Sequence, residues 1–274
     1  KKFWPHVLDK NKFDPVDDQL AARMHKAIAI MQFKLEGQLI KEHPEFDLDK
    51  RLLLDKIDFE NGTVNVEGTV YPLNDTFFPT IDPNNPYELT EDERAVMNSL
   101  SASIINSERL QTHIRYMFSH GALYKRINGN LLFHGCIPMD ENGDFLPVDI
   151  YGAKCAGRAL MDHLDKQIRA SYFTPEKIKK YGKAGDLMWY LWLAKDSPLF
   201  GKEKMTTFER LFIDDKASHK EHVRPYYKLI NSKKPCEKIL REFGLDPSHS
   251  KILNGHVPVK IKNGESPIKG GGLL

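Results

Sequence analysis

The sequence of 274 residues lacks several features that mark particular classes of protein. It has three cysteines and no Cys-x-x-Cys pair, so neither a disulfide framework nor a zinc ribbon is expected, and a reducing cytoplasm is the default location. No window reaches the roughly 18 apolar residues of a bilayer-spanning helix, and no signal peptide is visible. The 40 Lys and Arg almost cancel the 38 Asp and Glu, which argues against a nucleic-acid surface built on bulk charge.

The composition that remains is that of an ordinary globular chain. Hydrophobic residues make up 41% and charged residues 28%, and the length suits one large or two small domains. Both ends are unusual: the chain begins at Lys1 without a methionine and stops at Gly270-Gly-Gly-Leu-Leu274, as if inside a glycine turn that enters an apolar strand. We therefore expect a piece of a larger protein.

The first part of the chain predicts two helical stretches around a small β-meander. Three- and four-residue spacing of apolar side chains predicts a helix from about Asp14 to His43. Turn signals at Asn61-Gly62 and Glu67-Gly68 predict a meander within residues 52–73. A capping box at Thr90 and Glu93 opens further helices that run to Gly121 with a break near Asn106. The predicted apolar face of the first helix consists of Leu20, Met24, Ile28, Met31, Leu35 and Leu39.

The second part predicts β structure at both ends of a helical stretch. Asn128-Gly129 predicts a hairpin whose outgoing strand ends in His134-Gly135. Residues 152–244 are mainly of helical pattern. A short strand over 251–253 then precedes Gly255-His256, and another is predicted over 259–261.

His134 and His256 are the strongest candidates for chemistry, because each follows a predicted strand beside a glycine. Imidazoles at strand ends, where glycine permits a sharp turn, are rigidly presented metal ligands. Two histidines that are hydrogen-bonded near the edge of the core would give the same pattern. The residues alone leave both interpretations open.

Resemblance to a known family favours the first interpretation. Residues 130–138, Asn-Leu-Leu-Phe-His-Gly-Cys-Ile-Pro, resemble the His-Gly signature of the calcineurin-like metallophosphoesterases, although Cys136 stands where the family has a second glycine. Residues 254–256, Asn-Gly-His, resemble its late Gly-His motif. Three longer stretches resemble the class III fructose-1,6-bisphosphatases, namely residues 24–40, 197–210 and 254–271. The resemblance covers nearly the whole chain.

The resemblance implies an α/β (α+β) fold, a partial calcineurin-like β-sandwich with large helical insertions. It also implies four segments along the chain. These are a mainly helical insertion with the meander over 1–121, a core hairpin with the His-Gly motif over 122–151, a helical insertion over 152–248, and core strands with the Gly-His motif over 249–274.

The function implied is hydrolysis of the 1-phosphate of fructose 1,6-bisphosphate, a gluconeogenic step, at two divalent ions, usually Mn²⁺. Imidazole and carboxylate ligands suit Mn²⁺, and His134 and His256 match the two histidines that bind one of the ions. The family's Asp-x-His, Gly-Asp-x-x-Asp-Arg-Gly and Gly-Asn-His motifs do not occur in the sequence. We therefore expect the catalytic residues to lie in a part of the enzyme outside these 274 residues. We also expect this polypeptide alone to be inactive.

Basic side chains are candidates for the second phosphate of the substrate, because Arg forks match phosphate geometry. Arg210, inside one of the class III stretches, is the first choice. The others are Arg158, Arg169, Arg224, Lys202 and Lys204, each of which is individually more typical of a surface or ion-pair residue. The partners expected are a sugar bisphosphate and further copies of the chain, without nucleic acid or membrane. The alternatives are a phosphatase for phosphoproteins or nucleotides, and a regulatory or oligomerisation module.

Overall fold

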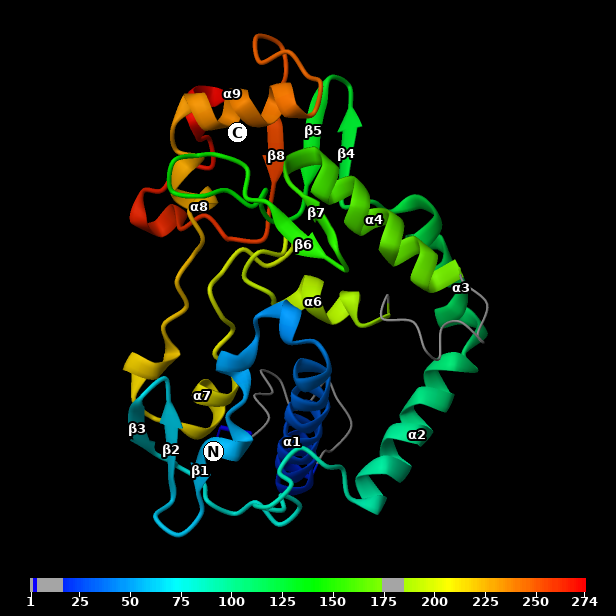
Figure 1. The fold of residues 1–274 in the computed structure, drawn as a ribbon, viewed down its shortest axis with the longest axis vertical. Helices are drawn as coiled ribbons and strands as arrows, with labels where there is room; N and C mark the ends of the chain where they lie inside the picture. Colours follow the sequence, from blue (N-terminus) through cyan, green and yellow to red (C-terminus); the bar gives the residue numbers. More distant parts are fainter. Residues whose placement is uncertain (1, 4–16, 174–184) are drawn as a thin grey trace. The chain divides into compact units, whose positions relative to one another are not determined.

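The computed structural model describes residues 2–3, 17–173 and 185–274 and divides into two compact units (Figure 1). Unit 1 comprises Lys1–Ser107 and Thr206–Lys220, and unit 2 comprises Glu108–Met205 and Glu221–Leu274. Helices and small sheets occur in both, which confirms the mixed α/β (α+β) class. Among the helices described, none combines the length and apolar character needed to cross a bilayer.

The units cut across the four segments predicted from the sequence. Residues 108–121 belong to unit 2, although they were grouped with the first insertion, and residues 206–220 belong to unit 1, although they lie inside the second. The segment boundaries and the calcineurin-like sandwich therefore stay predictions.

Unit 1 is built around the long helix α1 (Asp18–Glu42). The side chain of Asp17 caps the helix by accepting hydrogen bonds from the backbone N–H groups of Gln19 and Leu20. The helix ends just before Pro44, which forces the preceding residue out of the α region. Both ends lie within four residues of the prediction. The other helices of unit 1 are η1 (Pro44–Phe46), η2 (Asp49–Arg51), η3 (Leu54–Lys56), α2 (Glu91–Ile105), α7 (Thr207–Phe212) and η5 (Lys216–His219).

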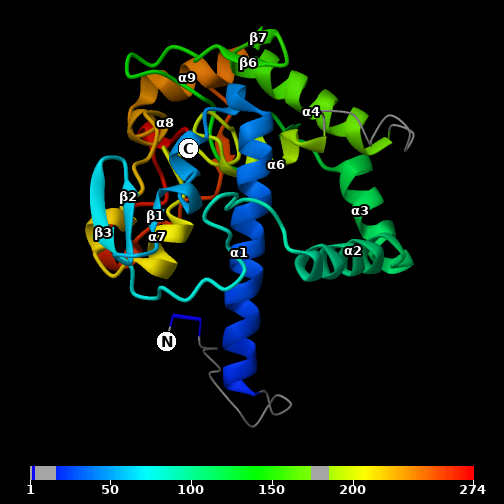
Figure 2. The ribbon, with the colours of Figure 1, turned by 60° about the horizontal axis from the view of Figure 1, so that its bottom comes forward.

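The predicted apolar face of α1 is wrong for the first half of the helix. Leu20, Met24 and Ile28 are each about half exposed, at 55%, 55% and 51%. Figure 2 shows this half of α1 extending beyond the other described elements of unit 1. Burial begins at Ile30, because the core of the unit contacts only the second half. That core consists of Ile30, Phe33, Leu53, Leu54, Val64, Val66, Phe78, Ile81, Tyr87, Phe208, Phe212 and Ile213.

The predicted meander is present. Strands β1 (Ile57–Asp58), β2 (Thr63–Val66) and β3 (Thr69–Pro72) form an antiparallel sheet in the order β1-β2-β3. The two predicted turns join the strands, and Gly62 and Gly68 adopt positive φ angles of 63° and 89° there. Glycine tolerates these angles without the clash that a Cβ would cause.

A buried ion pair joins the capping box of α2 to α1. Thr90 Oγ1 accepts a bond from Glu93 N at 3.2 Å, and Glu93 Oε2 accepts one from Thr90 N at 2.9 Å, as predicted. Lys34, fully buried on α1, donates to Glu93 Oε2 at 2.7 Å and to the carbonyl of Thr80. Burial acts to raise the pKa of Glu93, but the bonds from Lys34 and Thr90 outweigh it and hold that pKa below its ordinary value.

Gly37 allows the ring of Tyr87 to lie directly against α1. A Cβ at position 37 would overlap that ring. The ring is only 3% exposed. Its hydroxyl donates to Asp55 Oδ1 at 3.0 Å, and Gln38 Nε2 donates to the Tyr87 carbonyl at 2.6 Å. Because the ring is anchored at both ends, it has no room to withdraw.

We expect Gly37→Ala to destabilise the protein, although alanine favours a helix interior by about 1 kcal/mol over glycine. Overpacking a closed site costs about 1–3 kcal/mol, so the urea midpoint should fall. As a control, Gly37→Ala made in a Tyr87→Ala background should be neutral or stabilising relative to Tyr87→Ala alone, since the obstructing ring is gone. A higher midpoint for the single variant would contradict the packing described.

Unit 2 contains a three-stranded mixed sheet. Strands β4 (Tyr124–Ile127) and β5 (Asn130–Phe133) form the predicted hairpin around Asn128-Gly129, and β8 (Ile252–Asn254) pairs with β5 in parallel. A second sheet consists of β6 (Val148–Ile150) and β7 (Ala153–Cys155). The helices are α3 (Glu108–His120), α4 (Gly157–Phe173), α6 (Leu187–Leu193), α8 (Tyr226–Leu229), α9 (Lys233–Glu242), η6 (Ile261–Asn263) and η7 (Gly270–Gly272).

The strand predicted over residues 259–261 is wrong. The chain there is irregular and leads into η6, with Ile261 74% exposed. The alternation of Val259 and Ile261 is typical of a β-strand, but no strand among the described residues pairs with this segment. Alternation alone does not supply hydrogen-bond partners for the backbone N–H and C=O groups.

Candidate metal centre

Parallel pairing brings the two predicted histidines to the same edge of the sheet. Leu132 is opposite Leu253 and Phe133 is opposite Asn254, so both chains leave the sheet at the same end. The carbonyl of His134 then accepts a bond from Gly255 N at 2.9 Å. The imidazoles face each other, with His134 Nε2 and His256 Nδ1 3.0 Å apart and the rings at 72°. Residues 122 positions apart in the chain thus form one pair.

The loop that carries His134 is held by close backbone contacts. Cys136 N donates to the carbonyl of Pro198 at 2.9 Å, and a Cβ on Gly135 would lie 2.5 Å from the same oxygen. Asn254 Nδ2 donates to the Gly135 carbonyl at 2.8 Å, and it also lies 3.1 Å from Tyr226 Oη. Sequence reasoning did not single out Asn254 or Pro198 for this role, although both lie inside the stretches that resemble the class III family.

His256 adopts a backbone conformation that favours glycine. Its φ angle is +64°, and a left-handed conformation costs a residue with a Cβ about 1 kcal/mol or more. Such strain persists where a particular side chain is needed at that point. The conformation of His256 is therefore consistent with a functional imidazole.

The surroundings of His256 favour its neutral form. Burial lowers the pKa of His256, and the charges of His134 and Lys202 lower it further. Its Nε2 atom is buried and has no hydrogen-bond partner among the described residues. A neutral imidazole offers the lone pair that a metal ion requires.

The separation of the two nitrogens, 3.0 Å, is that of a hydrogen bond between the rings. It also fits a shared divalent ion, because two nitrogen ligands about 2.1 Å from one octahedral ion and at right angles to each other lie about 3.0 Å apart. Among the described residues, no third His, Cys, Asp or Glu offers an atom within 4.8 Å of both. The pair alone thus offers an ion at most two of these ligands.

Comparison with known proteins assigns the chain to a family. A family model described as Firmicute fructose-1,6-bisphosphatase matches residues 1–274. The chain belongs to this family. It is 52% identical over 274 residues to the fructose-1,6-bisphosphatase class 3 of Clostridium acetobutylicum, 53% over 276 residues to that of Clostridium tetani, and 52% over 272 residues to that of Clostridium novyi.

These alignments cover 99–100% of this chain but only 41% of each relative. The chain therefore spans about two fifths of the length of the curated relatives it matches. No solved structure gives a significant match.

The candidate substrate contact predicted from the sequence, Arg210, lies on α7 in unit 1, whereas the histidine pair lies in unit 2. Arg210 Nε donates to Thr206 Oγ1 at 3.1 Å, and Arg210 Nη2 donates to the carbonyl of His219 at 3.0 Å. These bonds fix the guanidinium within its own unit. Its contact with substrate stays a prediction.

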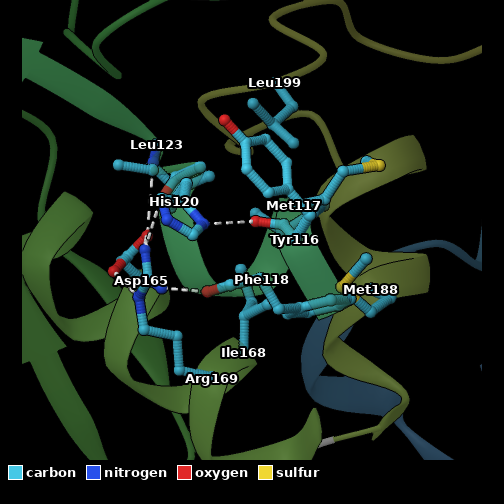
Figure 3. Close-up of a pocket in the computed structure, with 13 residues that line it drawn as sticks. Tyr116, Met117, Phe118, His120, Leu123, Asp165, Ile168, Arg169, Met188 and Leu199 are labelled. Atoms are coloured by element: carbon cyan, nitrogen blue, oxygen red, sulfur yellow. Dashed lines mark hydrogen bonds and ion pairs between the residues drawn. The ribbon is translucent and has the colours of Figure 1, made fainter. Parts of the chain in front are cut away.

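Arg169 holds the segment that leads into β4, the first strand of the three-stranded sheet. Figure 3 shows it at the edge of a mainly apolar cavity of about 540 Å³. Its guanidinium donates to the carbonyls of Phe118 and Gly121 at the end of α3, and to Asp165 Oδ2 at 2.6 Å. Asp165 in turn accepts a bond from Leu123 N at 3.3 Å. Arg169 thus orients the segment that enters β4.

Proposed function

We propose that this chain is part of a class 3 fructose-1,6-bisphosphatase, which hydrolyses the 1-phosphate of fructose 1,6-bisphosphate to fructose 6-phosphate and phosphate. The observation that carries the proposal is the facing pair of His134 and His256 in a chain that matches the family over its full length. The activity for which the relatives are named supports this substrate. The step is gluconeogenic, and we place it in the cytoplasm.

The two imidazoles are the proposed ligands of one of two divalent ions, most suitably Mn²⁺. When bound, such ions supply positive charge to the phosphoryl oxygens during an in-line displacement. The chain's own contribution is positioning. The parallel register of β5 and β8 sets the separation of the imidazoles, and Asn254 fixes the Gly135 carbonyl beside His134. Burial lowers the pKa of His256 and so favours its neutral form.

The remaining ligands and the catalytic acid are proposed to lie in the part of the enzyme outside these residues. Two histidines alone hold Mn²⁺ weakly, because it stands at the low end of the affinity order of divalent ions. We therefore expect no metal-dependent phosphate release from the 274-residue polypeptide alone. Measurable release from the purified polypeptide would contradict this division of the site.

The proposed function is tested by phosphate release from the full-length protein with Mn²⁺. Fructose 1,6-bisphosphate should be hydrolysed with a higher kcat/KM than a phosphoserine peptide or a nucleoside monophosphate. Chelation with EDTA should abolish the activity, and added Mn²⁺ should restore it. A preference for the phosphopeptide or the nucleotide would favour the alternative phosphatase, and the absence of any hydrolysis would favour a regulatory module.

Arg210 is proposed as a contact for the substrate, and the full-length enzyme is proposed to be a homo-oligomer. In the same assay, Arg210→Gln should raise KM for the bisphosphate about tenfold, the expected cost of one charge-assisted bond. An unchanged KM would remove Arg210 from the site. Light scattering of the full-length protein decides the oligomeric state, with a strict monomer as the contrary result.

A further inference from the structure

The segment that follows α6 packs against His256 and against the backbone just after His134. Within it, the Pro198 carbonyl accepts the bond from Cys136 N, directly after the His134-Gly135 pair. The ring of Phe200 lies 6.5 Å from that of His256, centroid to centroid, at a steep angle of 74°. Residues 198–200 thus form one wall beside the candidate metal centre, and residues that follow them lie close to it.

Lys202, two residues after Phe200, is held in place by its backbone. Gly201 has a φ angle of +61°, and a Cβ there would lie 2.8 Å from Cys136 Sγ. The carbonyl of Gly201 accepts a bond from Arg224 N at 3.0 Å, and Lys202 forms an isolated antiparallel bridge with Val223. The charge of Lys202 contributes to the lowered pKa of His256, as expected of an ammonium close to the pair.

Among the described residues, the ammonium of Lys202 has one carboxylate partner, Glu221, whose Oε2 lies 2.8 Å from Nζ. The lysine side chain remains 28% exposed, so an incoming anion can reach it. Arg224, in contrast, is held between Asp196 and Glu203 at 2.8 and 2.5 Å. A group paired with one carboxylate exchanges it for a phosphate more readily than a group held between two.

We propose that Lys202 binds the phosphate of the bisphosphate that is not hydrolysed, and that this phosphate displaces Glu221 from the ammonium. The assignment rests on the proposed function, in which the ion site takes the phosphate that is cleaved. Lys202 is paired with Glu221 and not with either imidazole, and we assign it to the phosphate that the ion site does not take. A dianionic phosphate attracts an ammonium more strongly than a single carboxylate does.

Two substitutions with opposite expected effects test the proposal in the full-length enzyme with Mn²⁺. Lys202→Gln should raise KM for fructose 1,6-bisphosphate about tenfold or more, while kcat/KM for p-nitrophenyl phosphate, which has no second phosphate, stays within about twofold. Glu221→Gln should lower KM for the bisphosphate, since it removes the competing carboxylate. Lys202→Arg should recover part of the loss. Lys234→Gln, a change at an exposed lysine of α9, is the matched control.

Each outcome decides the question. Calorimetric titration with fructose 1,6-bisphosphate should rank the affinities of the wild type and the variants in the same order as their KM values. A purely structural role of Lys202 would not produce this order. Equal losses on both substrates, or a Lys202→Gln variant that behaves like Lys234→Gln, would overturn the assignment and leave the proposed function intact. If the wild-type enzyme releases no phosphate from the bisphosphate, the proposed function fails, and the role of Lys202 fails with it.

Discussion

Substitution of His134 or His256 with alanine is expected to lower both Mn²⁺ affinity and phosphate release in the full-length enzyme by at least about a hundredfold. Residues that only support a metal ligand already contribute about 10–100-fold to affinity or activity, and these two imidazoles are proposed as the ligands themselves. Their nitrogens face each other at 3.0 Å, so loss of either removes half of what this chain offers the ion. Calorimetric titration with Mn²⁺ and a phosphate-release assay measure the two effects.

A matched control separates the pair from histidines in general. His249, exposed and in the same unit, should tolerate alanine with unchanged Mn²⁺ binding. The double variant of His134 and His256 should be little worse than either single variant, because ligands of one ion act as a unit. If a single variant keeps wild-type metal content and activity, the alternative interpretation holds, and the two histidines are only a hydrogen-bonded pair at the edge of the sheet.

Lys34→Met is expected to destabilise unit 1 by about 3–5 kcal/mol, the usual cost of leaving one partner of a buried ion pair unpaired. Lys34 is fully buried, and Glu93, its partner, is 7% exposed. The same substitution also removes the bond to the Thr80 carbonyl. The midpoint of urea unfolding, with a probe in unit 1, measures the loss.

Two further variants give this prediction its controls. Lys41→Met, at an exposed position of the same helix, should change stability by no more than about 1 kcal/mol. Lys34→Met combined with Glu93→Gln should recover much of the loss, because no charge is then left buried and glutamine still completes a capping box. A full loss in the double variant would show that the charge of Glu93 is not the cause.

The cost of Lys34→Met should also depend on pH. The pKa of Glu93 is lower in the folded state than its ordinary value of about 4.3. The stability that the ion pair contributes is therefore fully present above about pH 4.3 and is lost as the pH falls through the lower pKa of the folded state. The difference between wild type and variant should therefore shrink in acid. A difference that is constant between neutral pH and pH 3 would contradict this assignment.

Local signals in the sequence predicted local structure well. The capping box at Thr90, the turns at Asn61-Gly62 and Asn128-Gly129, and the limits of α1 all depend on a few neighbouring residues. The structure also places His134 and His256 together at a sheet edge, as expected from two strand-glycine-histidine patterns. Their role as metal ligands stays a prediction.

Features that depend on distant contacts were not predictable in this way. Nothing in the spacing of Leu20, Met24 and Ile28 shows that the core stops short of them. Lysine is almost always exposed, so the burial of Lys34 depends on a carboxylate on another helix. The position of Phe200 beside His256 likewise results from a tertiary contact between segments with no common sequence pattern.

The parallel pairing of β5 and β8 also determines when the candidate metal centre is assembled. A hairpin such as β4 and β5 closes over a few residues, whereas β8 reaches β5 only after residues 134–251 have been brought back to the sheet. The entropy of closing so long a loop is lost before the pair contributes any stability. The ion binding proposed for His134 and His256 would therefore report on the completed pairing of β5 with β8, and not on the earlier closure of the hairpin.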